Sequence, residues 1–174
     1  MPQLSRTIAD EFNRQIQAEL DSAYLYLSMS AYCDTINLQG AARWLRVQWQ
    51  EELEHATKLI DYMSERGGAV ALRAIGEPPA TFGSLLDLFR QVLQHEREVT
   101  ASIYRIYDLA VSEKDYAAQT LLQWYVGEQV EEENSAQEIV SMLELAGDSG
   151  SALLMVDRHL AGRSTQVANG SGER

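Results

Sequence analysis

Residues 67–81, GGAVALRAIGEPPAT, interrupt an otherwise helix-forming sequence. The chain has three prolines, and two of them, Pro78 and Pro79, lie in this stretch together with three glycines. On either side, long segments run without a helix breaker, and their apolar residues recur at helical spacing. The stretch is therefore a long connection between two groups of helices.

The helical spacing predicts four long helices, over residues 5–35, 39–66, 82–111 and 114–146, and a short fifth helix over residues 151–161. Gly147 follows the fourth helix, where a C-terminal glycine cap is expected. Short turns at residues 34–38 and 112–114 make the first and second helices antiparallel neighbours, and likewise the third and fourth.

The connection at residues 67–81 differs from these short turns. The second helix is about 40 Å long at 1.5 Å per residue, and fifteen extended residues reach roughly 50 Å. The connection can therefore run the length of a bundle and leave the second and third helices parallel. A flexible linker between two domains is the alternative. It is less favoured, because neither helical hairpin alone could bury its apolar stripe. We expect one all-α domain over residues 1–162 and a disordered polar tail over residues 163–174.

Composition narrows the classes of function. The 174 residues carry 14 Lys and Arg against 26 Asp and Glu, a net charge of −12. A chain with this net charge is better suited to binding cations than to binding nucleic acid or an anionic membrane. The charge could also serve solubility alone.

The single cysteine, Cys33, excludes a scaffold of intrachain disulfides. No apolar run reaches the roughly 18 residues of a membrane span, and no signal peptide is evident at the N-terminus. We expect a cytoplasmic protein.

The predicted inward face of each long helix carries a carboxylate. These are Glu19, Glu52, Glu96 and Glu132. Burying one unpaired carboxylate costs several kcal/mol, and four facing one another would repel unless a cation neutralised them.

The register of the helices indicates that these groups meet at one level. Glu19 precedes Asn37, in the first turn, by nearly the same length of chain as Glu52 follows it. Glu96 and Glu132 lie in the same way on either side of Glu113, in the second turn. All four separations agree within about one helical turn. The alternative is that these are ordinary surface glutamates whose long side chains reach solvent.

Residues 52–55, ELEH, supply a Glu-x-x-His pair. The i, i+3 spacing places the Glu52 carboxylate and the His55 imidazole on one helical face, where they can grip one metal ion. Oxygen ligands with a single imidazole suit iron or manganese, whereas a structural zinc site would use more Cys or His.

The sequence resembles the ferritin family, and more closely the bacterial non-haem ferritins, over nearly its whole length. The stretches that carry the resemblance are ELDSAYLY (residues 19–26), EELEHA (51–56), HE (95–96), LQWYVGEQVEEE (122–133), LAGDSG (145–150) and LLMVD (153–157). The resemblance implies a ferritin-like four-helix bundle with one long crossover and a short fifth C-terminal helix.

The resemblance also implies a ferroxidase centre with two iron positions. The residues implied are Glu19, Glu52 and His55 for the first position, Glu96 and Glu132 with Glu52 as bridge for the second, and Gln129 as a neighbouring polar group. A third, outer iron position would use Glu51, Glu128, Glu131 and Glu132. Tyr26 matches a tyrosine beside the centre, although a core tyrosine with a bonded hydroxyl is equally consistent. Trp124 matches too, and we expect it to serve packing.

Two departures from related proteins bear on function. Di-iron bundles of the general type carry two Glu-x-x-His motifs, but here the fourth helix has Gln129 and Glu132 without an imidazole. The second iron should therefore be held more weakly. Bacterioferritins place a haem-binding methionine after the glutamate of the second helix, where this chain has Leu53, so we expect no haem.

The implied function is iron storage and detoxification. The ferroxidase would oxidise Fe²⁺ with dioxygen or hydrogen peroxide and store it as a ferric oxyhydroxide mineral in a homo-oligomeric hollow cage of 24 subunits. Two alternatives remain open at this point: a di-iron oxidase or peroxidase acting on a small molecule, and a metal-free helical scaffold.

Overall fold

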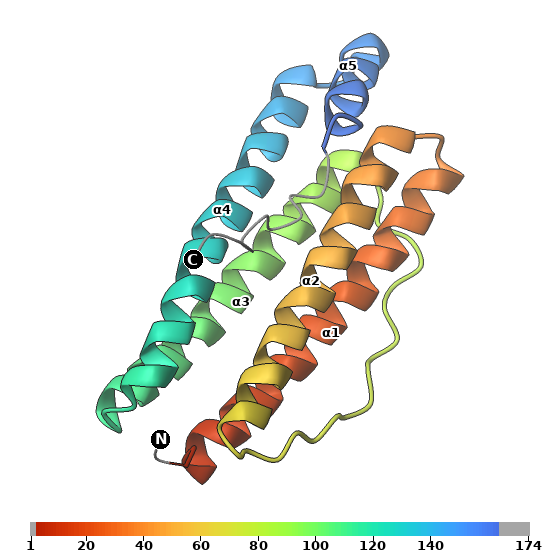
Figure 1. The fold of residues 1–174 in the computed structure, drawn as a ribbon. Coiled ribbons are helices and arrows are strands. Elements are labelled where there is room, and N and C mark those ends of the chain that lie inside the picture. The colour runs from red at the N-terminus through yellow and green to blue at the C-terminus, as the bar shows by residue number, and fades with distance from the viewer. Residues whose placement is uncertain (1–2, 164–174) are drawn as a thin grey trace, which may run out of the picture.

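The computed structural model describes residues 3–163, and within them all regular secondary structure is helical. The helices are α1 (Arg6–Thr35), α2 (Gln39–Glu65), α3 (Leu85–Ser112), α4 (Tyr116–Ala146) and α5 (Gly150–Leu160). Four long helices form a bundle, and α5 sits at one end of it (Figure 1). The all-α four-helix bundle with a short fifth helix is thus confirmed. The tail predicted to be disordered lies, apart from Arg163, outside the described residues.

The crossover between α2 and α3 runs along the outside of the bundle beside α1, so that α2 and α3 are parallel (Figure 1). Polar side chains of α1 hold it at successive turns. Asn13 bonds both the Ala69 carbonyl oxygen, at 2.9 Å, and the Ala71 amide, at 2.7 Å. Further along, the Ser28 hydroxyl donates to the Pro79 carbonyl at 2.6 Å. The connection is therefore anchored along its length although it contains no helix.

Local caps set most of the helix boundaries. Ser84 and Asp87 form a capping box at the start of α3. The helix therefore begins at Leu85, three residues later than predicted. Asp115 caps α4 by accepting from the Ala118 amide at 3.0 Å. Asn37, in the first predicted turn, adopts a φ of 60°, a left-handed conformation that asparagine tolerates well.

The N-terminus of α2 is capped differently, because Leu38 supplies no side-chain hydrogen bond. The carboxylate of Asp157 in α5 takes this role and accepts from the amides of Gly40 at 3.1 Å and Ala41 at 2.8 Å. The approach is close. A Cβ atom on Gly40 would lie 1.7 Å from the carbonyl oxygen of Asp157. Glycine at this position therefore allows α5 to dock on α2.

The apolar core is divided into two clusters. One contains Met29, Trp44 and Phe89 and lies toward α5, and the other contains Phe12 and Ile103 and lies toward the opposite end. On α2, Trp49 is only half-buried, whereas Trp44 and Gln48 are buried. Trp44 belongs to the apolar cluster to which α5 contributes, so the docking of α5 widens the buried face of α2.

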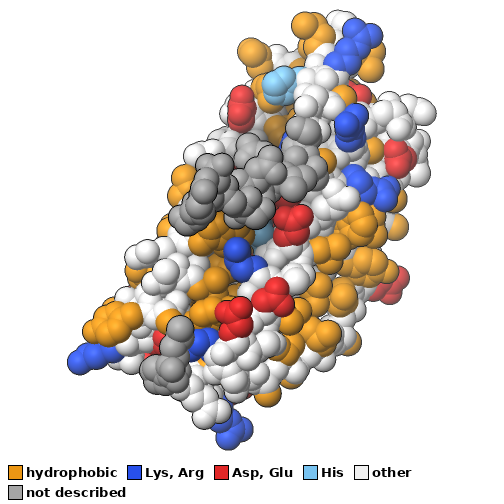
Figure 2. Space-filling model, in the orientation of Figure 1, with side chains coloured by type: hydrophobic (Ala, Val, Ile, Leu, Met, Phe, Trp, Pro, Cys, Tyr) orange, Lys and Arg blue, Asp and Glu red, His pale blue; other side chains and the backbone are white. Residues whose placement is uncertain are grey.

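The surface between α2 and α4 is an open groove of about 550 Å³, lined by Leu53, Glu54, Thr57, Lys58, Asp61, Tyr62, Glu65 and Leu121. Acidic side chains gather on this face around a basic one (Figure 2). Among the described residues, none of the helices is long and apolar enough to cross a membrane.

The contact at Gly40 yields a stability prediction. The Gly40→Ala variant should lose about 1–3 kcal/mol of unfolding free energy, because the added methyl group overpacks the contact with Asp157. The measurement is denaturant-induced unfolding at a fixed protein concentration. Gly127→Ala is the control: its Cβ would meet nothing within 4 Å. This control should gain about 0.5–1 kcal/mol, because alanine is the better helix former. Equal stability of the two variants would contradict a close α2–α5 contact.

Candidate metal centre

A polar layer lies between the two apolar clusters. It receives side chains from all four long helices, and each of them is at most 7 % exposed. The members are Glu19 from α1, Glu52 and His55 from α2, Glu96 from α3, and Gln129 and Glu132 from α4. The four glutamates that the helix register aligned thus lie in the core together with His55 and Gln129.

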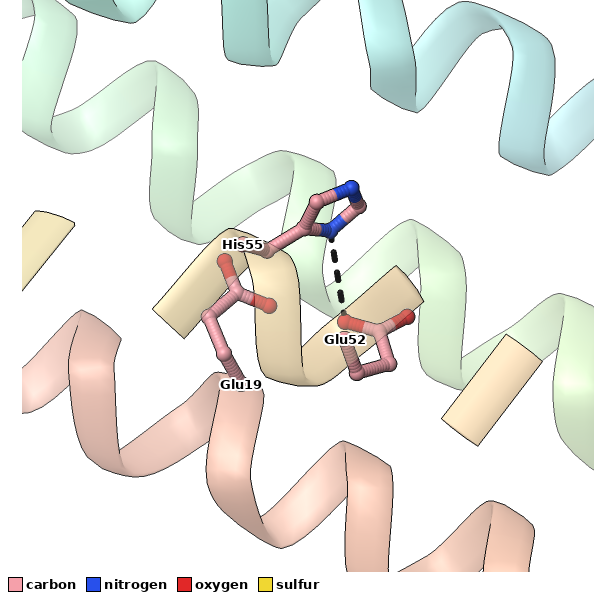
Figure 3. A group of neighbouring side chains, drawn as sticks. All are labelled: Glu19, Glu52 and His55. Carbon is pink, nitrogen blue, oxygen red and sulfur yellow. Dashed lines mark ion pairs between the residues drawn. The ribbon is translucent and has the colours of Figure 1, made fainter. Parts of the chain in front are cut away.

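Glu19, Glu52 and His55 form the tightest part of this layer. Each offers one ligand atom, and these atoms all lie within 4.8 Å of one another. Glu19 extends from α1 toward the pair on α2 (Figure 3). The His55 Nδ1 atom lies 3.4 Å from a carboxylate oxygen of Glu52. This geometry fits a single cation held by two carboxylates and an imidazole.

Aromatic residues of α4 fix the position of His55. The Tyr125 hydroxyl donates to the His55 backbone carbonyl at 2.7 Å. The Trp124 ring meets the imidazole edge-on, with centroids 5.4 Å apart. The Lys58 ammonium group lies over the Trp124 ring, 4.2 Å from its centroid. Trp124 therefore packs beside the centre, as expected from the sequence.

Glu96 and Glu132 form the other half of the layer. Glu96 accepts hydrogen bonds from the Tyr26 hydroxyl and from the Gln129 side-chain amide, the latter at 3.1 Å. Glu132 accepts from the side-chain amide of Gln48 at 2.7 Å. Tyr26 thus lies beside the centre with its hydroxyl bonded, and Gln129 acts here as a hydrogen-bond donor to a carboxylate.

Two further buried glutamines in this layer were not predicted from the sequence. Gln48 supports Glu132, and Gln15 donates to Glu19 at 2.9 Å while accepting from Ser102 at 2.7 Å. Both lie four residues before a carboxylate of the centre, on the same helical face. Inward-facing glutamines one turn away from buried glutamates were a signal that the sequence contained.

The charges of the layer are not balanced by the protein. Burial and the charge of Glu52 raise the pKa of Glu19 well above its ordinary value. Burial and the charges of Glu96 and Glu132 do the same to the pKa of Glu52. One oxygen of Glu19 is buried without a hydrogen-bond partner. A cation between these carboxylates would supply both the missing contact and the missing charge.

A profile of the ferritin-like domain matches residues 9–146. This chain belongs to the ferritin family. It is 39 % identical to the bacterial non-heme ferritin of Campylobacter jejuni over 157 residues, which covers 90 % of this chain and 94 % of the relative. It is 40 % identical to the bacterial non-heme ferritin of Bacteroides fragilis over 160 residues, covering 92 % and 99 %.

The fold agrees with these sequence relationships. A crystal structure of the open-pore ferritin from the archaeon Archaeoglobus fulgidus superimposes with a TM-score of 0.92 at 51 % identity, covering 92 % of this chain and 99 % of that one. The resemblance to bacterial non-haem ferritins is thereby confirmed.

The carboxylates predicted for the third, outer iron position are not grouped as closely as those of the inner trio. Glu51 and Glu128 are half-buried, and Glu131 is exposed. Within residues 3–163, the trio of Glu19, Glu52 and His55 is the only group of three or more acidic, His or Cys residues whose ligand atoms lie within 4.8 Å of one another. Glu51 instead pairs with Arg163 at 2.6 Å. The third iron position stays a prediction.

The other two histidines are not part of this trio. His95 bonds the Ser22 hydroxyl through Nε2 at 2.7 Å, and its ring meets Tyr26 edge-on. It is therefore not one of the grouped ligands, in line with its place off the predicted stripe. His159 is exposed on α5.

The unbalanced charge predicts how stability depends on pH. Burial and the charge of Glu96 raise the pKa of Glu132 from 4.5 to about 8. Folding of the metal-free ferritin is therefore undisturbed by this group below pH 4.5, and the destabilisation grows as the pH rises toward 8. Glu132→Gln should remove it and raise the unfolding free energy at pH 8 by roughly 1–3 kcal/mol.

The measurement is denaturant unfolding of chelator-treated protein at pH 5.5 and pH 8. Glu138→Gln is the control, because it makes the same change of charge at an exposed position of the same helix. Identical pH dependence in the two variants would show that Glu132 carries no unbalanced charge.

Proposed function

We propose that this ferritin oxidises Fe²⁺ with dioxygen at a di-iron centre and stores the product as a ferric oxyhydroxide mineral inside a hollow cage of 24 subunits. The observation that carries the proposal is the group of Glu19, Glu52 and His55 in the core, with a buried Glu19 oxygen that has no partner. Glu96 and Glu132 provide a second set of carboxylates in the same layer.

Iron is the substrate that this set of ligands suits. Carboxylate oxygens with one imidazole fit Fe²⁺, and the positive charge of two ions would offset the repulsion among the glutamates. Glu19, Glu52 and His55 would hold the first iron. Glu52 would bridge to the second, held by Glu96 and Glu132, with Gln129 beside it. Each Fe²⁺ loses one electron, and dioxygen accepts both.

The residues of the centre have distinct tasks in this reaction. They bring two Fe²⁺ ions close together while leaving coordination positions open for dioxygen. Gln15, Gln48 and Tyr26 donate hydrogen bonds to the carboxylates and thereby orient them. Because the second position lacks an imidazole, its iron is held more weakly. Weak binding suits a substrate that moves on to a mineral store.

The remaining properties follow from the same family relationship. The relatives from Campylobacter jejuni and Bacteroides fragilis are non-heme ferritins. The place of the haem-binding methionine is taken here by Leu53, so we expect no haem. Dioxygen or hydrogen peroxide would be the oxidant, and the cytoplasm the compartment.

Anaerobic titration with Fe²⁺, followed by iron loading in the presence of dioxygen, separates this function from the two alternatives. Saturable uptake at two or three ions per chain, with a large hollow particle in solution, supports a ferritin that stores iron. Absence of uptake would support a metal-free scaffold. A di-iron oxidase acting on a small molecule would bind iron without building a mineral.

Replacement of His55 tests the first iron position. The His55→Ala variant should oxidise Fe²⁺ roughly 10- to 100-fold more slowly than the parent, because the centre loses its imidazole. Stopped-flow absorbance at two Fe²⁺ per subunit gives the rate, and gel filtration shows that the particle still assembles. His159→Ala, at an exposed position on α5, should leave the rate unchanged. An unchanged rate in His55→Ala would remove this residue from the mechanism.

Replacement of Glu128 and Glu131 tests the third position. The double variant Glu128→Ala, Glu131→Ala should keep the first fast oxidation, because the ligands of the inner pair remain. It should change the number of irons oxidised per dioxygen and slow the clearing of the centre. Oxygen consumption measures the stoichiometry, and crystals soaked in Fe²⁺ show the positions. Iron retained at the outer position, or an unmoved stoichiometry, would contradict the assignment.

A further inference from the structure

A cationic side chain already lies on the outer edge of the centre. The guanidinium group of Arg163 donates to a carboxylate oxygen of Glu51 at 2.6 Å and to the side-chain oxygen of Gln48 at 2.8 Å. It also lies over the ring of Trp44, 4.3 Å from the centroid. Glu51 is one of the carboxylates predicted to bind the third iron. The arginine thus neutralises the carboxylate that the proposed function assigns to the third iron.

The docking of α5 brings Arg163 to this place. Asp157 fixes α5 on the N-terminus of α2 through the amides of Gly40 and Ala41. Leu160, one turn later, is buried in the apolar cluster on this side of the layer. Arg163 follows three residues after Leu160, and its contacts with α2 all lie within two turns, at Trp44, Gln48 and Glu51. The position of the guanidinium group is therefore set by packed structure on both sides.

The contacts of Arg163 also reach the inner pair. Gln48 accepts from Arg163 through its side-chain oxygen and donates through its amide nitrogen to Glu132 at 2.7 Å. With its two amide atoms bonded to these partners, Gln48 has one orientation. The arginine thus holds Glu51 directly and orients Glu132 through one intervening side chain.

A guanidinium group and a metal ion cannot share Glu51 freely. Both are cations attracted by the charge of the same carboxylate, and they repel each other at short distance. We propose that Arg163 is a resident counter-cation of Glu51 that a metal ion must displace to occupy the outer position. Arg163 is then a positioning residue that sets the affinity of the outer position for a metal ion. When Arg163 is displaced, Gln48 loses one of its two partners and can move with the side chain of Glu132. The inference rests on the proposed function and specifies how its third iron position is regulated.

The test measures metal binding without turnover. Chelator-stripped, full-length protein is titrated calorimetrically with Zn²⁺, a divalent ion that is not oxidised, and anomalous diffraction from soaked crystals assigns the occupied positions. Arg163→Gln removes the competing charge, so the outer position should bind Zn²⁺ about three- to fivefold more tightly, the size expected for a partly exposed ion pair. Arg163→Lys keeps the charge and should stay within about twofold of the parent.

Two further variants complete the design. Arg90→Gln is the matched control, because Arg90 also pairs with a glutamate, Glu144, at 2.8 Å but at an exposed site. It should leave the outer affinity unchanged. Glu51→Gln should remove the anomalous peak at the outer position while the inner positions still fill.

The outcomes separate this inference from the function on which it rests. Unchanged or weaker outer binding in Arg163→Gln, or equal tightening in Arg163→Lys, would overturn the role of the arginine while filled inner positions left the ferroxidase proposal standing. An outer position that stays empty in every variant would also overturn it. Inner positions that take up neither Zn²⁺ nor Fe²⁺ would instead overturn the proposed function.

Discussion

The burial of several carboxylates at one level of a helical bundle is the constraint on which this structure depends. Desolvation and mutual repulsion raise the pKa values of Glu19, Glu52 and Glu132, and one oxygen of Glu19 has no partner. Such an arrangement destabilises a metal-free fold and is tolerable only where the rest of the molecule compensates. The two apolar clusters provide that compensation, because they enclose the polar layer from both ends and keep all four helices in register.

The same constraint explains the polar residues around the layer. Gln15, Gln48 and Gln129 each donate an amide to a carboxylate, which favours the charged form without adding a competing positive charge inside the layer. A lysine or arginine in these places would neutralise the layer permanently and close it to a cation. The positive charge is found at the edge instead, on Arg163, where its partner Glu51 is only half-buried. The interior thus remains open to a cation that arrives from outside.

The sequence alone predicted the helices and the alignment of the inner carboxylates, and the features that it did not predict have physical causes. Apolar periodicity and turn lengths were enough to align Glu19, Glu52, Glu96 and Glu132, because register along a straight helix is a local property. The start of α3 was missed by three residues because a capping box, rather than the apolar pattern, sets it. Trp44 was missed because its burial depends on α5, which is distant in the sequence. Gln48 was missed although its place one turn before Glu52 was a signal in the sequence. Arg163 was assigned to a disordered tail because it begins the polar sequence of residues 163–174.

The fifth helix therefore connects stability with the chemistry of the centre. Because α2 lacks a cap of its own, Asp157 must come from α5 to satisfy the amides of Gly40 and Ala41. A glycine is needed there for the two backbones to approach. Once α5 is docked in this way, Arg163, three residues beyond its end, lies beside Glu51, about three turns along α2 from Gly40. A helix whose capping contact lies at one end of the bundle thus places a charge at the metal layer near its middle. Changes at Gly40 or Asp157 would therefore reach the centre through the position of Arg163, although neither residue touches a carboxylate of the layer.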